Sequence, residues 1–342
     1  MQVGIGPWGM QVPVASGFTH EQVYRETLEQ VELAEALGFD SAWLTEHHFL
    51  PCGYLPKLLT AAAAMAARTT RIRIGTGVTL LPLYDPIHVA EETTVVDLVS
   101  GGRLIFGIAP GYRPEEFAGF GQQRERRGAR MEEAMQVLIR AWTEDRFSHA
   151  GEFYRYDDMS VTPKPVQKPH PPIWIGASRR EGVRRAARHG VPLLASPRHR
   201  IEELAEHYRM YREACEAFGT SCDEVPIMRD VFVGETTAQA EAEARDHVVY
   251  IHREWYGAWS EHRAITTDRG KRVEDKNEVL FEEVRGRFII GDPESVLREI
   301  LRYRDELGMT HLIARMQYPG LPHDAAVRSM KLFASEVMPQ LR

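Results

Sequence analysis

Short runs of β-forming residues alternate with runs of helical periodicity along almost the whole 342-residue chain. This alternation predicts a parallel sheet, because each strand needs a crossover helix before the chain can return to the same edge. Eight strand and helix units favour a (β/α)8 TIM barrel over a doubly wound sheet, which would have to leave out strands. The strands are expected at 2–6, 40–44, 71–80, 102–109, 173–176, 192–195, 227–233 and 311–316.

The helices between these strands are recognised by apolar stripes and by capping residues. The segment Thr19–Gln22 forms a capping box, and Gly38 ends the helix behind it. Apolar residues of 131–142 are spaced by four, three and four positions, which is typical of a helix that buries one face. Helices are expected at about 19–38, 56–68, 86–99, 131–142, 179–189, 200–218, 236–256, 292–307 and 327–337.

Two segments interrupt the alternation. Residues 146–171 are rich in proline and are predicted to form an irregular insertion after the fourth βα unit, with a short hairpin at most. Residues 257–287 are polar and weakly periodic, and they are predicted to form a lid-like loop after strand seven, because long loops are usually functional or mobile. Neither segment is regular enough to be a second domain, so residues 1–342 are expected to form one barrel domain.

Charge and hydropathy exclude some classes of partner. The net charge is −7 and the basic residues are scattered, which argues against nucleic acid as a partner. Four arginines between Arg124 and Arg130 are interpreted as a solvated helix start. The longest apolar stretch, 58–67, is too short to span a membrane, so no membrane is expected.

The cysteines and the start of the chain suggest a cytoplasmic protein. Cys52, Cys215 and Cys222 form an odd and sparse set, which argues against a disulfide framework. They lack the spacing of zinc ligands, so no metal site is expected. The first residues carry no basic and apolar pattern of a signal peptide.

Two adjacent histidines behind a glutamate are the first candidate for catalysis. Glu46, His47 and His48 directly follow the strand predicted at 40–44. Active sites of barrels lie at the carboxyl ends of the strands, and histidine titrates near neutral pH. Because adjacent side chains on a strand point to opposite faces, only one of the two histidines can easily face the cavity. We expect this to be His47, with His48 in a supporting role.

Small residues stand at three further strand ends, where they would let a flat ligand approach the backbone. These ends are 75–77, 107–111 and 176–178. The last one runs directly into a predicted helix, whose free N–H groups make a natural phosphate site. Taken alone, Gly107 and Gly111 are better explained by a tight βα turn, whereas the turn at 176–178 is equally explained by an ordinary helix cap.

Several segments also match a known family in the same order along nearly the whole chain. They are 38–49, Gly75-Thr76, Leu81-Pro82, Pro86, 98–103, 106–108, Gly111, Ala186-Ala187, Gly190, Pro192, 329–333 and 337–339. On these residues the chain resembles the bacterial luciferase-like flavin monooxygenases, and most closely the luciferase α-type subunit. Each motif is modest alone, but the ordered set is specific.

The resemblance implies a reaction. Family members bind reduced FMN, or in a sister branch a deazaflavin, in the mouth of an α/β barrel. The chain is therefore expected to use FMNH2 and O2, through a C4a-peroxyflavin, to oxidise a small organic substrate. His47 falls on the family's catalytic histidine, with Glu46 and His48 expected to orient it. A separate flavin reductase is expected, because no Gly-x-Gly-x-x-Gly follows a strand and opens a helix here.

The resemblance also implies flavin-binding positions. Gly77-Val78 falls where the family has a non-prolyl cis peptide beneath the isoalloxazine ring, and Tyr112 is expected to line the pocket. The phosphate-binding turn falls on Gly176, Ala177, Ser178, Arg179 and Gly182.

Some luciferase positions are changed. Ala109 replaces the reactive cysteine and is expected beside the flavin, Pro110 replaces a phosphate-contacting arginine, and Pro197 replaces a flavin-contacting tryptophan. These changes argue against light emission and a long-chain aldehyde substrate. Arg179 is a candidate to supply the missing phosphate cation.

Two other functions and the assembly state remain open. A deazaflavin-dependent dehydrogenase on the same fold would transfer hydride and ignore O2. A non-catalytic flavin-binding subunit is the third alternative, although the presence of His47 argues against it. A homodimer is expected, since the family commonly pairs through helices near strands two and three, and the alanine-rich run 61–67 would allow close packing.

Overall fold

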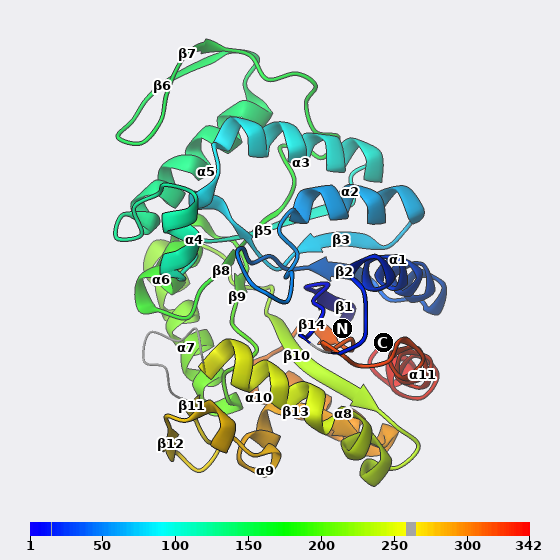
Figure 1. Ribbon diagram of the computed structural model, residues 1–342. Helices are drawn as coiled ribbons and strands as arrows, with labels where there is room; N and C mark the ends of the chain where they lie inside the picture. Colours follow the sequence, from blue (N-terminus) through cyan, green and yellow to red (C-terminus); the bar gives the residue numbers. More distant parts are fainter. Residues whose placement is uncertain (15, 258–264) are drawn as a thin grey trace.

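The computed structural model describes residues 1–14, 16–257 and 265–342. Its described residues form a sheet of ten strands in the order β13-β10-β14-β1-β2-β3-β5-β8-β9, with β4 beside β5, and all of these strands pair in parallel. The sheet curls, and helices cover its outside (Figure 1). This curled α/β arrangement is consistent with the predicted TIM barrel.

The elements have the following bounds. The strands of the large sheet are β1 (Gln2–Trp8), β2 (Ser41–Leu44), β3 (Arg73–Thr76), β4 (Thr79–Leu80), β5 (Leu104–Ala109), β8 (Ile173–Gly176), β9 (Leu193–Leu194), β10 (Pro226–Val233), β13 (Phe288–Gly291) and β14 (His311–Arg315). The main helices are α1 (His20–Leu37), α2 (Leu58–Arg68), α3 (Pro86–Ser100), α4 (Pro114–Gly119), α5 (Arg127–Thr143), α6 (Arg180–His189), α7 (Ile201–Phe218), α8 (Thr237–Ile251), α10 (Pro293–Leu307) and α11 (His323–Leu332).

All eight predicted strands coincide with strands of this sheet. The strand predicted at 71–80 is divided into β3 and β4, and the peptide bond between Gly77 and Val78 in the gap is cis, as the resemblance implied. One strand, β13, was not predicted at all. It pairs with the second half of β10, where Asp230 lies opposite Phe288.

The two segments predicted to be irregular contain short elements, and the short hairpin expected in the first is present. The antiparallel hairpin of β6 (Phe147–Ala150) and β7 (Arg155–Met159) occupies the first and projects from the body of the molecule (Figure 1). Within 257–287, residues 258–264 lie outside the described part of the chain. The rest of the predicted lid-like loop contains short elements, namely β11 (Ile265–Thr266), β12 (Arg272–Val273), α9 (Phe281–Val284) and two 3-10 turns at Lys276–Glu278 and Arg285–Arg287.

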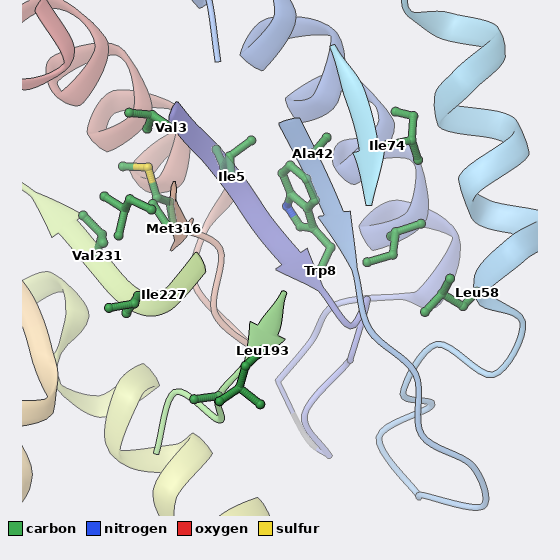
Figure 2. Close-up of a cluster of buried hydrophobic side chains, with 14 of the residues drawn as sticks. Val3, Ile5, Trp8, Ala42, Leu58, Ile74, Leu193, Ile227, Val231 and Met316 are labelled. Carbon is green, nitrogen blue, oxygen red and sulfur yellow. The ribbon is translucent and has the colours of Figure 1, made fainter. Parts of the chain in front are cut away.

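Alternate residues along the strands build two apolar layers, because successive strand side chains point to opposite faces. The large layer lies between sheet and helices; Figure 2 shows part of it, with Val3 and Ile5 of β1, Ala42 of β2 and Val231 of β10. A smaller cluster lies on the inner face of the curled sheet. It contains Trp43, Ile105, Trp174, Leu194, Met228 and Ile313.

The two ends of the chain meet. The amino group of Met1 donates a hydrogen bond to the carbonyl of Leu341 at 3.1 Å, and the termini lie together beside β1 and α11 (Figure 1). Among the described residues, no helix has the length and apolar character needed to cross a membrane.

Candidate active site

His47 lies three residues beyond β2 at the carboxyl-terminal edge of the curled sheet, which we call the mouth. Its Nδ1 atom is 2.8 Å from Oε1 of Glu116, a carboxylate whose side chain is fully buried. The histidine side chain itself keeps 12% of its surface exposed. A carboxylate on Nδ1 selects the tautomer in which Nδ1 carries a proton, so that Nε2 is the nitrogen that exchanges protons.

Glu116, which lies on α4, is held in place by His48 and Arg113. Its Oε1 atom also accepts the backbone N–H of His48 at 3.0 Å, and Arg113 Nη1 lies 3.3 Å away. Arg113 in turn donates to the carbonyl of His48 at 2.7 Å. Burial alone would raise the pKa of Glu116, but the hydrogen bond and charge of His47, the N–H of His48 and the charge of Arg113 outweigh it and lower this pKa. Glu116 is therefore ionised when it holds His47.

Glu46 and His48, which were expected to orient His47, have other hydrogen-bond partners in the structure. Glu46 accepts the N–H of Leu80 at 2.7 Å, and its carboxylate is 4.0 Å from His48 Nε2. His48 Nε2 lies 3.0 Å from the hydroxyl of Tyr84. Burial raises the pKa of Glu46 to about 8, and burial lowers the pKa of His48 to about 4. Near neutral pH the two side chains form an uncharged network behind His47.

Aromatic rings surround the exposed side of His47. Its ring meets Tyr54 edge-on at 4.8 Å between centroids and Tyr112 at 5.8 Å, which places Tyr112 beside the predicted site. Tyr54 continues to Trp255, whose ring lies 5.3 Å away. His48 faces the other way and packs edge-on against Phe120 at 4.7 Å. The two histidines thus point to different environments, as strand alternation predicts.

Small residues at the ends of β3, β5 and β8 bring the backbone of the mouth unusually close together. A Cβ on Gly107 would stand 2.0 Å from the carbonyl oxygen of Thr76. A Cβ on Gly176 would stand 3.0 Å from Val78 Cγ1 and 3.3 Å from Ala109 Cβ. The structure therefore brings together Val78, Ala109 and Gly176, three of the predicted flavin positions. We call this cluster of small residues the floor of the mouth.

The predicted phosphate turn leads into α6, with Arg179 as the residue before its first turn. Helix and turn are packed tightly, since a Cβ on Gly182 would stand 2.6 Å from Ala177 Cβ. Burial, and then the positive charges of Arg124 and Arg179, lower the pKa of Arg127. Arg179, at this helix start, is thus near enough to Arg127 for their charges to interact.

Residues 124–130 were interpreted as a solvated helix start, and α5 does begin at Arg127, but the segment is only partly solvated. Arg126 is exposed, but Arg124, Arg127 and Arg130 are partly buried. Arg127 donates to the carbonyl of Arg124 at 2.9 Å, and Arg130 donates to the carbonyl of Pro82 at 3.2 Å. The segment is packed against the mouth and adds positive charge there.

Residues 9–311 match the family model described as luciferase-like monooxygenase. The chain belongs to the luciferase-like monooxygenase family. The match confirms the resemblance seen in the sequence, and it identifies the protein as a flavin-dependent type of oxidoreductase.

Relatives of this luciferase-like monooxygenase cover almost its whole length. The oxygenase component of flavin-dependent trigonelline monooxygenase from Acinetobacter baylyi is 27% identical, with 94% of this chain and 91% of that protein covered. The F420-dependent glucose-6-phosphate dehydrogenase of Amycolatopsis mediterranei is also 27% identical, with 93% and 95% covered. The crystal structure of monooxygenase RslO1 from Streptomyces bottropensis matches with a TM-score of 0.88 and 26% identity, over 100% of both chains. Relatives that use flavin and relatives that use the deazaflavin F420 thus both occur.

The luciferase-like monooxygenase site contains residues that the sequence did not single out. Glu116 and Arg113 lie in a polar segment after β5 that gives no sign of packing against His47. Arg124 and Arg127 were noticed only as charges. A signal does exist for Glu116, because a carboxylate soon after a barrel strand end is a natural partner for a histidine on a neighbouring strand.

Proposed function

We propose that this luciferase-like protein is the oxygenase component of a two-component monooxygenase, which takes reduced FMN from a separate reductase and oxidises a small organic substrate with O2. The observation that carries the proposal is the His47 and Glu116 pair, at 2.8 Å, beside the floor of small residues in the mouth. A histidine fixed by a buried carboxylate is a general acid and base at neutral pH.

The residues present fit a flavin. Val78, Ala109 and Gly176 are small and lie close together, so a planar ring system could pack against them. Arg179, with Arg124 and Arg127, would supply cations for the phosphate beside the N–H groups that begin α6. When bound, reduced flavin supplies the electrons and reacts with O2, which no amino-acid side chain does.

The protein's own share of the reaction is proton control and shielding from water. Glu116 keeps the proton on Nδ1 of His47, so Nε2 gives up or takes the proton of the reacting groups. Arg113 fixes both Glu116 and the backbone of His48, so the pair cannot swing away from the mouth. Tyr54 and Tyr112 cover the histidine ring and limit the access of water.

Two observations support the proposal of a separate reductase. The relative from Acinetobacter baylyi is an oxygenase component by name, which implies a separate source of reduced flavin. In this chain Gly4, Gly6 and Gly9 have the spacing of a dinucleotide-binding fingerprint, but they lie within and just after β1, and α1 begins only at His20. A fingerprint that does not open a helix lacks the N–H groups that bind a pyrophosphate.

The experiment mixes the protein with one equivalent of reduced FMN without oxygen, adds aerated buffer, and follows flavin absorbance. We expect the wild-type protein to delay the return of oxidised flavin relative to free FMNH2. His47→Ala and Glu116→Gln are expected to change the rate of that return by about 10- to 100-fold while FMN affinity changes little. Arg179→Ala should instead weaken FMN binding. Reoxidation at the rate of free flavin by the wild-type protein would contradict the proposal.

The second candidate is a deazaflavin-dependent oxidoreductase that transfers hydride. It is favoured by the F420-dependent relative from Amycolatopsis mediterranei, whose identity to this chain equals that of the monooxygenase relative. Equilibrium binding of FMN and of F420 decides between the two. Binding of F420 with little affinity for FMN would support hydride transfer.

We also propose that the whole chain is one domain and that two copies form a dimer through α3. Val95, Leu98 and Val99 on this helix are spaced by three and four residues, and 49%, 41% and 47% of their surfaces are exposed. Apolar residues at this spacing form one continuous stripe on the helix surface. Such a stripe favours a self-complementary contact between two copies.

A further inference from the structure

Phe49 has an unusual conformation for a phenylalanine. Its side chain leaves 60% of its surface exposed to solvent, although phenylalanine is usually buried. Its φ angle is +58°, in the left-handed region that favours glycine. A bulky residue stays in this region only where its surroundings outweigh the cost, so the neighbours of Phe49 determine its conformation.

The ring of Phe49 lies on the end of α4. Gly119 is the last residue of this helix, and a Cβ placed on it would meet three atoms of the Phe49 ring, the third of them at 2.9 Å. A real Cβ does not come so close to other heavy atoms, so the ring can lie here only because residue 119 is a glycine. The ring of Phe120 is also near, at 5.4 Å between centroids.

The residue before Phe49 holds the same helix at its other end. The N–H of His48 donates to Oε1 of Glu116 at 3.0 Å, and the carbonyl of His48 accepts from Arg113 at 2.7 Å. Arg113 is the N-cap residue of α4, and Gly119 ends it. His48 and Phe49, two consecutive residues, therefore contact α4 at its beginning, its middle and its end.

Such contacts matter because α4 is short. It has six residues, and its N-cap residue makes no side-chain capping hydrogen bond. A helix of this length is not stable by itself in water. Phe117 anchors its buried side in a small apolar cluster with Leu80 and Leu83. Gly119 lies on the exposed side, so Phe49 adds a contact that this cluster does not provide.

The position of α4 determines the contact between Glu116 and His47. Oε1 of Glu116 is 2.8 Å from Nδ1 of His47, and the side chain of Glu116 is fully buried. A hydrogen bond weakens steeply as its distance and angle depart from the ideal. Any outward movement of α4 would therefore weaken the interaction that keeps the proton of His47 on Nδ1.

We propose that Phe49 and Gly119 are positioning residues, whose contact holds α4 so that Glu116 stays against Nδ1 of His47. The proposal rests on the monooxygenase function proposed above, because it names residues that maintain the working tautomer of the catalytic histidine. Phe49 and Gly119 act through Glu116 and need no contact with flavin or substrate. The place of the ring on Gly119 also explains the left-handed backbone of an exposed phenylalanine.

Two variants open the contact in different ways. Phe49→Ala removes the ring, and Gly119→Ala displaces it. Gly119→Ala is expected to fold as well as the wild type, because the exposed ring can turn into solvent and alanine favours a helix over glycine. This variant separates a change in the site from a loss of stability, and urea unfolding checks that it does.

The tautomer of His47 is the first readout. It is measured by nitrogen NMR on flavin-free protein that contains isotope-labelled histidine, at a pH where His47 is neutral, with the signals assigned by His47→Gln. We expect the wild-type protein to carry the proton on Nδ1, and both variants to populate the Nε2 tautomer as well. Flavin reoxidation is the second readout. Each variant should change its rate by about three- to tenfold in the direction of Glu116→Gln, less than the loss of the carboxylate itself.

The double variant tests whether the two residues act through one contact. Once Phe49 is alanine, the Cβ of Gly119→Ala no longer meets a ring, so the double variant should behave like Phe49→Ala alone. The control is Phe218→Ala, which removes an exposed phenylalanine at the end of α7 and should change neither readout.

A wild-type tautomer in both variants would overturn the proposal, and so would additive effects in the double variant. A wild-type His47 without its proton on Nδ1 would also overturn it, because Glu116 would then not set the tautomer. Failure of the monooxygenase function appears separately, as wild-type protein that does not alter flavin reoxidation, since the NMR measurement needs no flavin.

Discussion

Glu46 and His48 show how single buried residues set the response of this fold to pH. The ordinary pKa of Glu46 is 4.5 and its folded value is about 8, so the folded chain holds this proton more tightly than the unfolded chain. The contribution of Glu46 to the unfolding free energy is therefore complete below pH 4.5 and is lost as pH rises towards 8. His48 acts in the opposite sense, because its pKa falls from 6.5 to about 4, and its contribution is lost as pH falls through that range.

The contributions of Glu46 and His48 to the unfolding free energy can be distinguished above pH 6.5, where only Glu46 of the two still titrates. We expect the wild-type protein to lose roughly 2 kcal/mol of unfolding free energy between pH 6.5 and 8 relative to Glu46→Gln. Glutamine keeps an oxygen for the N–H of Leu80 but carries no proton to lose. Urea unfolding at a series of pH values measures the difference, with Glu202→Gln, on the exposed face of α7, as the control. Parallel curves for wild type and Glu46→Gln would show that Glu46 is not the titrating group.

At the scale of single residues, the sequence indicated His47 but gave no indication of its partner Glu116. The histidine follows a strand end directly, and position along a barrel strand is a local property. Glu116 is 69 residues away, and the contact depends on how α4 folds back over the end of β2. The charges of Arg124 and Arg127 were visible in the sequence, but their burial depends on the packing of α5 against α6, which Arg185 and Glu132 tie together at 2.9 Å.

The elements of the mouth depend on a close approach between β3 and β5. The hydroxyl of Thr76 lies 2.7 Å from both the N–H and the carbonyl of Gly107, and a Cβ on Gly107 would meet backbone at 2.0 Å. Gly107→Ala is therefore expected to lower the unfolding free energy by about 1–3 kcal/mol and to weaken FMN binding, because strands must separate. Denaturant unfolding and FMN titration measure both effects.

The matched control is Gly128→Ala in α5. A Cβ there would meet only the flexible end of Arg185 at 3.0 Å, and alanine favours a helix over glycine by about 1 kcal/mol. This variant should be as stable as the wild type or slightly more so. If Gly107→Ala and Gly128→Ala unfold alike, the contact between β3 and β5 is less tight than the structure indicates.

Elements with their own periodicity or caps were predictable, and those fixed by tertiary contacts were not. Thr19 and Thr236 accept the N–H groups of Gln22 and Gln239, as the capping boxes predict. The four residues of β13 follow a polar segment and run directly into the helix cap at Asp292, so no pattern marks them as a strand. They pair with β10, and all of α8 lies between the two strands in the chain.

At the scale of the whole molecule, the curled sheet is completed by β1 between β2 and β14, which joins the two ends of the chain. The alternation of strands and helices predicts a parallel sheet, but this contact between the two ends of the chain has no local pattern in the sequence. On the outer surface, α3 exposes three apolar side chains together, Val95, Leu98 and Val99. Exposed apolar patches of this kind are uncommon on proteins that stay monomeric.

Substitution of Leu98 by aspartate tests whether this face joins two copies. A charge buried in a two-fold contact meets its own copy or an apolar surface, which costs far more than the same charge in water. We expect the wild-type protein to elute as a dimer in size-exclusion chromatography with light scattering, and Leu98→Asp to elute as a folded monomer. Val166→Asp provides the control, because Val166 is equally exposed, at 48%, but lies outside α3. A dimer that survives Leu98→Asp with unchanged stability would place the contact elsewhere, whereas a monomeric wild-type protein at micromolar concentration would show that the face of α3 does not hold two copies together.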